Sequence, residues 1–276
     1  MMGSRRFVPG LVVSLLVAAT VISLPLRAAE PGRPAPDDWQ TVKGKHFIVR
    51  YRGSSDFAEA ALGKAESGYE KIAAGLGYDR RDKFWLWSDR VTICLYATRG
   101  DFVAAAGAPQ WAVGKANYRR REISSFSGSA GFVDALLPHE VTHLVFRDFI
   151  GFKSDVPLWL DEGVAQWFQE DRPSDADQPA RALARRNALI PLDELIKMDV
   201  RKQQDAETAA RFYAESASVV AYLIEKGGAD AFVQFCRGLR DGKSFAESLR
   251  FTYPEVGGTI AALETNWKKH LAGDKP

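Results

Sequence analysis

The sequence predicts an α+β fold, in which a mixed sheet with helices comes first and a mainly helical part follows. Strand patterns alternate with helical ones over residues 39–130. From residue 131 to residue 272, almost every apolar segment repeats at helical spacing. A segment with two histidines lies where the two patterns meet. We therefore expect one domain over residues 39–272, with a cleft and a functional site at this join.

The first 29 residues are predicted to be a secretory signal peptide. Arg5 and Arg6 give a basic start, an apolar run follows over residues 11–24, and Ala28 and Ala29 end the segment. The alternative is an uncleaved membrane anchor, but an uninterrupted apolar run of about 14 residues is short for a span of about 20. The sequence thus predicts an exported protein, periplasmic or extracellular, which meets the membrane only transiently through its leader.

Charge and cysteine content argue against nucleic-acid binding and against a metal site built from thiolates. Loss of the leader removes three of the 37 basic residues, which leaves 34 against 35 acidic ones. A mature chain with a net charge near −1 has no nucleic-acid footprint. Cys94 and Cys236 lie in apolar segments, so they either pair outside the cytoplasm or remain two buried thiols. Their spacing does not indicate a thiolate metal site.

The α/β part follows a Pro-rich linker at residues 30–38. Alternation of apolar and polar residues indicates strands, and apolar residues at helical spacing indicate the helices between them. The basic cluster at residues 118–122 is expected to be a solvated strand end. In chain order, the predicted elements are a strand at 46–51, a helix at 56–77, a strand at 90–98, a short helix at 99–107 and one or two strands within 111–126.

The second part is predicted to be helical. Pro138 and Pro157 each fit the first turn of a helix, where a missing N–H costs nothing. Segments rich in Asp, Arg and Gln, at 170–178 and 201–207, are expected to be loops. Further helices are predicted at 156–169, 190–198, 209–228, 229–239 and 260–272.

Two of the chain's four histidines lie four residues apart, in the segment HEVTH. On an α-helix, His139 and His143 therefore share one face and can direct both imidazoles at one ion. Glu140 projects roughly 100° away around the helix, from where it can reach a water on that ion. This is the H-E-x-x-H pattern and its mechanics. The alternative is an ordinary amphipathic helix whose histidines lie over the core.

A catalytic zinc site has three protein ligands and one open position, so the pattern needs a third ligand. Glu162 lies 19 positions after His143 on the next predicted helix, where Trp159 and Leu160 would anchor it in the core. Two neighbouring helices can then face each other across the ion. The sequence thus predicts one Zn²⁺ ion held by His139, His143 and Glu162.

The combination of HEVTH with the later segment WLDEG resembles the gluzincin zinc metallopeptidases, and among them the peptidase MA-like and aminopeptidase N-like proteins. The resemblance implies a thermolysin/gluzincin-like fold, with an N-terminal mixed sheet and a mainly helical C-terminal half. It also implies that His139, His143 and Glu162 bind the zinc ion and that Glu140 is the general base.

The same resemblance implies two further groups. Tyr213, in the segment YAESASVVAYL, stands in the place of a tyrosine that hydrogen-bonds the tetrahedral intermediate; the alternative is one more aromatic on a buried helix face. Gly114, Ala116 and Asn117 stand where the family has the edge strand of its cleft, which accepts a substrate backbone as an added strand. The alternative is an ordinary strand.

Polar residues near the motif are candidates for orienting its histidines from behind, as metal-binding histidines usually require. Asp148, Asp161 and Gln166 have suitable positions, and the sequence does not choose among them.

The expected function is zinc-dependent hydrolysis of a peptide or protein substrate outside the cytoplasm, by Glu-assisted attack of a zinc-bound water. The GAMEN segment of aminopeptidases is absent before His139, which favours an endopeptidase. Two alternatives stay open: a catalytically silent envelope binding module, and an amidase acting on cell-wall material. The sequence contains no G-x-S-x-G elbow, G-x-G-x-x-G or P-loop. It leaves the oligomeric state unknown.

Overall fold

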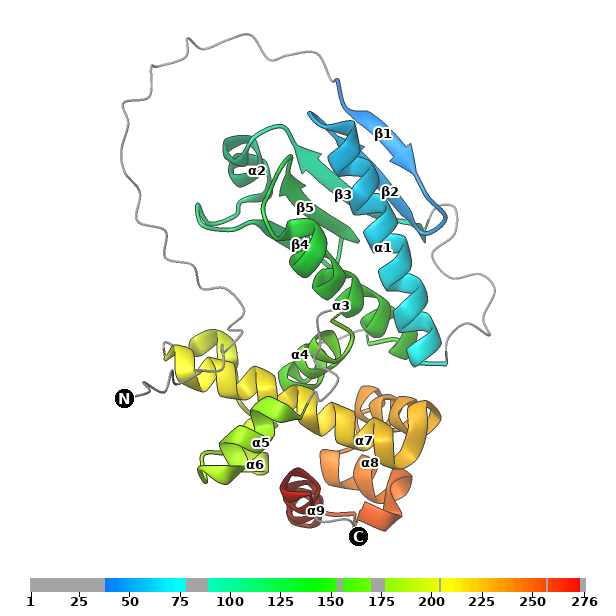
Figure 1. Cartoon of the computed structure of the whole chain (residues 1–276). Helices are drawn as coiled ribbons and strands as arrows, with labels where there is room; N and C mark the ends of the chain where they lie inside the picture. Colours follow the sequence, from blue (N-terminus) through cyan, green and yellow to red (C-terminus); the bar gives the residue numbers. More distant parts are fainter. Residues whose placement is uncertain are drawn as a thin grey trace, which may run out of the picture. The chain divides into compact units, whose positions relative to one another are not determined.

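The described residues form a five-stranded mixed sheet with the strand order β1-β2-β3-β5-β4 (Figure 1). The three inner strands run parallel, and both edge strands are antiparallel to their neighbours. The computed structural model describes residues 38–77, 89–152, 156–169, 177–203, 205–256 and 258–273, so the predicted leader and nearly all of the linker lie outside the described residues. The strands are β1 (Gln40–Lys43), β2 (Phe47–Tyr51), β3 (Val91–Tyr96), β4 (Gly114–Asn117) and β5 (Glu122–Phe126).

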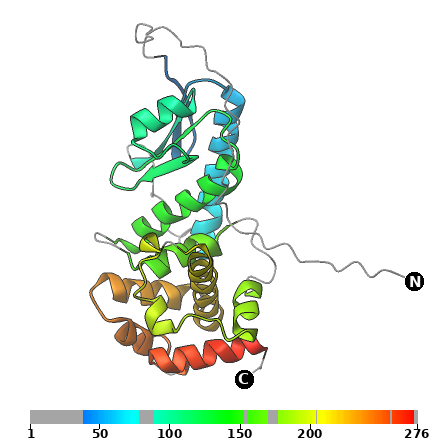
Figure 2. The same ribbon diagram turned by 90° about the vertical axis from the view of Figure 1, so that its left-hand side faces the viewer.

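Alternating residues of the strands face two apolar clusters. Val91, Ile93 and Leu95 of β3 point into the main core, which lies between the sheet and the helices α1 (Ser55–Gly75) and α3 (Leu137–Ile150). Tyr96 belongs to the opposite face, where a small cluster forms under Phe102 of α2 (Arg99–Ala106). Figures 1 and 2 show α1 and α3 side by side. Helix α3 thus packs against α1, which in turn packs on β2 of the sheet.

Helix α3 follows a π-helical turn, η2 (Phe132–Leu136). Pro138 lies in the first turn of α3, as predicted. The helix ends at Ile150, because Gly151 caps it in the left-handed conformation (φ 83°). Ten of its fourteen residues are buried, so α3 crosses the core as a rigid element.

The remaining elements are helical, as expected for this half of the chain. Helix α7 contains both predicted helices at 209–228 and 229–239, joined at Gly228, whose φ of 75° kinks the helix. Two helices, α5 and α8, lie outside the predicted segments. The elements are α4 (Leu158–Trp167), α5 (Gln178–Arg185), α6 (Leu192–Leu195), η3 (Val200–Lys202), α7 (Ala206–Arg240), α8 (Phe245–Thr252), η4 (Pro254–Val256) and α9 (Ile260–Ala272).

Two alternatives left open by the sequence can be compared with the structure. Cys94 and Cys236 are both buried free thiols, so they are not joined to each other. Among the residues that the structure describes, no helix combines the length and apolar character needed to cross a membrane.

A buried carboxyl group joins α7 to the chain before α6. The backbone N–H of Ile190 donates to both carboxylate oxygens of Glu215, at 2.9 and 3.1 Å, and Glu215 is fully buried. Burial raises the pKa of Glu215 to about 7, although the Ile190 N–H and Arg211 act in the opposite direction. The folded protein therefore binds a proton at this group more tightly than the unfolded chain does.

This difference predicts a pH-dependent stability. The contribution of Glu215 is fully present below its unfolded pKa of 4.5 and is lost as the pH rises through about 7. Relative to Glu215→Gln, the free energy of unfolding of the parent protein should fall by about 1–3 kcal/mol between pH 5 and pH 8. Urea unfolding of both proteins at the two pH values measures this difference. Parallel pH profiles would contradict the prediction.

Candidate metal centre

Helix α3 places two imidazoles together. His139 and His143 lie one turn apart, with ring centroids 4.6 Å apart and the two Nε2 atoms separated by 3.0 Å. The helix is held by Val141, Leu144 and Val145, which are buried in the core. Hydrophobic packing of α3 thus fixes the direction in which both rings point.

Helix α4 brings a carboxylate to the same point. Oε2 of Glu162 lies 3.5 Å from Nε2 of His139 and 3.7 Å from Nε2 of His143. The next residue, Gly163, allows α4 to approach α7 closely, because a Cβ atom there would lie 2.6 Å from the carbonyl oxygen of Ser216. The glycine of WLDEG therefore serves packing, and the glutamate before it faces α3.

These three atoms fit a tetrahedral metal ion. Bonds of ~2.0–2.1 Å at tetrahedral angles place ligand atoms roughly 3.3 Å apart. The observed separations of 3.0, 3.5 and 3.7 Å lie around this value. Among the described residues, His139, His143 and Glu162 form a group, the metal group, whose ligand atoms all lie within 4.8 Å of one another and could hold one ion. The predicted convergence of these three side chains is thus present in the structure.

The surroundings of the site favour positive charge. Nδ1 of the buried His143 lies 3.1 Å from Oδ1 of Asp161, which is itself buried. Burial alone would lower the pKa of His143, but Asp161, Glu162 and Glu140 outweigh it and raise this pKa to about 9. The negative charge of these carboxylates stabilises either a proton on the imidazole of His143 or a cation bound beside it.

Asp161 is the predicted orienting residue that the structure places behind a histidine. Its carboxylate also accepts hydrogen bonds from Arg147, at 2.5 and 3.3 Å. Burial would raise the pKa of Asp161, but His143 and Arg147 lower it, so the carboxylate stays ionised. Asp148 instead pairs with Arg121, and no hydrogen bond joins Gln166 to either motif histidine in the described part of the chain.

Glu140 lies beside the metal group without belonging to it. Its Oε2 atom accepts a hydrogen bond of 3.0 Å from the hydroxyl of Tyr118, in the loop between β4 and β5. Burial and the charge of Glu140 raise the pKa of Tyr118, so the phenol keeps its proton. The sequence interpretation of residues 118–122 as a solvated strand end is therefore wrong for Tyr118. The position of this tyrosine directly after the predicted edge strand was its only signal in the sequence.

Tyr213 lies in the first half of α7, three residues before Ser216, which contacts α4 at Gly163. Its ring is partly buried against the main core. This agrees in part with the alternative that Tyr213 is an aromatic residue on a buried helix face. Burial and the negative charge of Glu162 raise the pKa of Tyr213 to about 12, which keeps the hydroxyl protonated. Among the described residues, this hydroxyl makes no hydrogen bond.

The predicted edge strand is present as β4, at one end of the described sheet. Gly114 lies against η2, because a Cβ atom there would be 2.7 Å from Leu136 and 3.1 Å from Phe132. Ala116 is partly buried, whereas Asn117 is exposed and its side-chain oxygen accepts the N–H of Arg120 in the turn. The strand thus begins next to the turn that precedes α3, the helix that carries His139 and His143.

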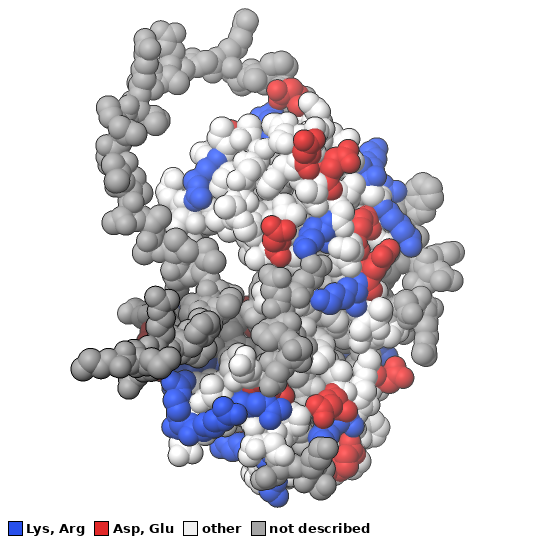
Figure 3. Space-filling model, in the orientation of Figure 1, with Lys and Arg blue, Asp and Glu red and all other residues white. Residues whose placement is uncertain are grey.

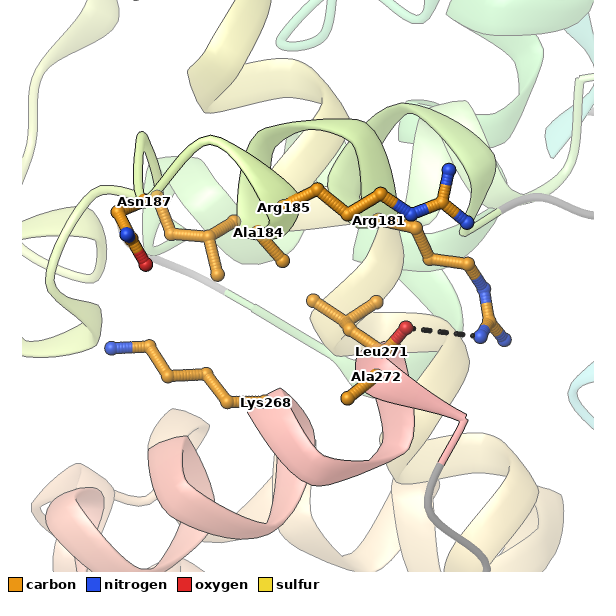
Figure 4. Close-up of a pocket in the computed structure, with 8 residues that line it drawn as sticks. Arg181, Ala184, Arg185, Asn187, Lys268, Leu271 and Ala272 are labelled. Carbon is orange, nitrogen blue, oxygen red and sulfur yellow. Dashed lines mark hydrogen bonds between the residues drawn. The ribbon is translucent and has the colours of Figure 1, made fainter.

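A pocket of about 450 Å³ lies apart from this site, between α5 and α9 (Figure 4). Arg181 and Lys268 line it, but Arg181 already donates to the carbonyls of His270 and Leu271, and Lys268 pairs with Glu264. Basic and acidic side chains are interspersed over much of the face in Figure 3, apart from a basic group over α5 and α6. No residue of α3 or α4 lines the pocket, so the metal centre lies elsewhere.

Comparison with known proteins gives a match to a family model. No curated protein shows a significant match to the chain. A family model described as the Peptidase MA superfamily matches residues 88–273, which include α3, α4 and all three residues of the metal group. Because the match covers more than half of the 276 residues, the chain belongs to the Peptidase MA superfamily.

Proposed function

We propose that this protein is a zinc-dependent metallopeptidase that hydrolyses internal peptide bonds of peptide or protein substrates outside the cytoplasm. The observation that carries the proposal is the convergence of His139, His143 and Glu162 on one point, with Glu140 beside them. The donor set of two imidazole nitrogens and one carboxylate oxygen suits zinc. The family assignment supports a metallopeptidase-type function.

His139, His143 and Glu162 would hold the ion, and Asp161 would keep His143 in the orientation that presents Nε2. A zinc ion bound there supplies Lewis acidity, which polarises the scissile carbonyl and lowers the pKa of water. Glu140 accepts a proton from the attacking water and passes it to the leaving amine. Tyr213 donates its hydroxyl proton in a hydrogen bond to the developing oxyanion.

Strand β4 is the proposed binding edge for the substrate. Gly114, Ala116 and Asn117 would offer backbone groups to an extended peptide, which adds to the sheet as a further strand. The sequence lacks the aminopeptidase segment that holds a free amino end. An endopeptidase is therefore the form of the activity that we propose. Export is supported by the leader pattern of residues 1–29.

Metal removal tests the proposal. The purified protein should contain one zinc ion per chain and should cleave members of a mixed peptide library. Dialysis against a chelator should abolish cleavage, and addition of Zn²⁺ should restore it, because the ion held by the three ligands is the only Lewis acid in the proposed mechanism. Zinc content and cleavage are measured on the same samples, with a magnesium addition as the control.

The outcomes separate the alternatives. Cleavage that survives complete removal of the metal would contradict the proposal. Full zinc occupancy without cleavage of any peptide would favour a catalytically silent binding module. Activity on peptidoglycan fragments, with none on peptides, would indicate a cell-wall amidase.

A further inference from the structure

The loop between β4 and β5 is fixed to the metal-binding helix by an ion pair outside the site. Arg121 ends this loop with a φ of 53°, which is unusual for a residue other than glycine. Its guanidinium pairs with Asp148 of α3 and donates to the carbonyl oxygen of Asp89 at 2.7 Å. The position of residues 118–121 relative to α3 therefore does not depend on Tyr118.

The ring of Tyr118, held in this loop, is enclosed by two charged or polar side chains. The guanidinium carbon of Arg147 lies over the ring, 4.2 Å from its centroid. The ring of His143 meets it edge-on, at a centroid distance of 6.0 Å and an angle of 74°. Arg147 is in turn fixed by Asp161. These contacts restrict the ring to an orientation that directs its hydroxyl at Glu140.

The hydrogen bond from Tyr118 makes the two carboxylate oxygens of Glu140 inequivalent. Oε2 accepts the phenol proton at 3.0 Å. Oε1 accepts no hydrogen bond from a described residue. Without this hydrogen bond, the half-buried side chain of Glu140 would sample several rotamers.

We propose that Tyr118 is a positioning residue, which holds the carboxylate of Glu140 so that Oε1 faces the reacting water. This inference deepens the proposed function and rests on it. Tyr118→Phe removes the hydroxyl and keeps the ring between Arg147 and His143. The variant should lose about 10- to 100-fold in kcat, because misplacement of a reacting group by about 1 Å costs that much. KM and zinc content should stay within twofold of the parent.

The matched control is Tyr253→Phe. Tyr253 is also buried, its hydroxyl has no hydrogen-bond partner among the described residues, and it lies at the end of α8. Its kcat should equal that of the parent protein. A kcat for Tyr118→Phe that also equals the parent's would overturn the positioning role.

A second measurement does not need activity. In the zinc-free full chain, Tyr118→Phe should lower the urea midpoint by roughly 0.5 M in the parent background, because a buried hydrogen bond to a charged group is lost. In a Glu140→Met background the same change should not lower the midpoint, whereas Tyr253→Phe should shift it equally in both. Equal shifts for Tyr118→Phe in both backgrounds would overturn the inference.

The two measurements keep this inference separate from the proposed function. If the parent protein cleaves nothing, the proposed function fails, and the urea midpoints alone decide whether Tyr118 holds Glu140. If the parent protein cleaves peptides, both kcat and the midpoints must change as stated.

Discussion

Replacement of Glu140 by Gln is expected to lower kcat/KM for peptide hydrolysis by about 10³–10⁴-fold, at the upper end of the range for loss of a general base. Gln has the shape of Glu and can still accept the hydrogen bond of Tyr118, but its amide cannot take a proton from water at neutral pH. Glu140 does not belong to the metal group, so the zinc content should not change. Kinetics on one cleaved peptide and zinc analysis of the same samples measure both quantities.

The matched control is Glu59→Gln, which makes the same chemical change on the exposed face of α1. Its kcat/KM should equal that of the parent protein. Equal hydrolysis by Glu140→Gln and by the parent would remove Glu140 from the mechanism. Loss of zinc together with activity would show instead that Glu140 supports the metal site.

The metal group could be predicted because its geometry is set by local rules. The spacing of His139 and His143 reflects one turn of an α-helix, which does not depend on the rest of the fold. Glu162 required only that the next helix pack against the first. The choice of Asp161 among the orienting candidates was different, because it depends on the rotation of α4 about its axis, which tertiary packing against α7 determines.

Tyr118 could not be predicted in this way. It lies 22 positions before Glu140 and reaches it through a loop whose place depends on the pairing of β4 with β5 and on the Arg121–Asp148 contact. No periodic pattern encodes such a contact. The interpretation of the cluster as solvated holds for Arg119 and Arg120, which are exposed.

The unpredicted elements have similar physical reasons. Strand β1 has four residues, of which three are exposed, so it shows little apolar alternation and is defined by pairing with β2. Helix α8 carries a local signal, because Ser244 and Glu247 form a capping box. Only two apolar residues of this helix, Phe245 and Leu249, pack against the core, which is too few for the periodic pattern on which the prediction relied.

Substitutions at the metal group and behind it are expected to produce a graded loss of zinc affinity. Asp161→Asn keeps the three ligand atoms and removes the charge that orients His143, so the affinity should fall about 10- to 100-fold. Glu162→Ala removes a ligand atom itself, and its effect should exceed that of Asp161→Asn, with a loss of more than about 100-fold. Competition with a zinc chelator at fixed pH measures each dissociation constant.

Asp148→Asn provides the control for this series, because it makes the same change as Asp161→Asn at a carboxylate that pairs with Arg121 rather than with a histidine. Its zinc affinity should equal that of the parent protein. The order of the three effects matters more than their size, since it follows from which atoms face the ion. An affinity that falls equally for Asp148→Asn and Asp161→Asn would mean that general negative charge holds the cation. Unchanged affinity in Glu162→Ala would exclude the carboxylate of α4 as a ligand and, with it, the three-residue site.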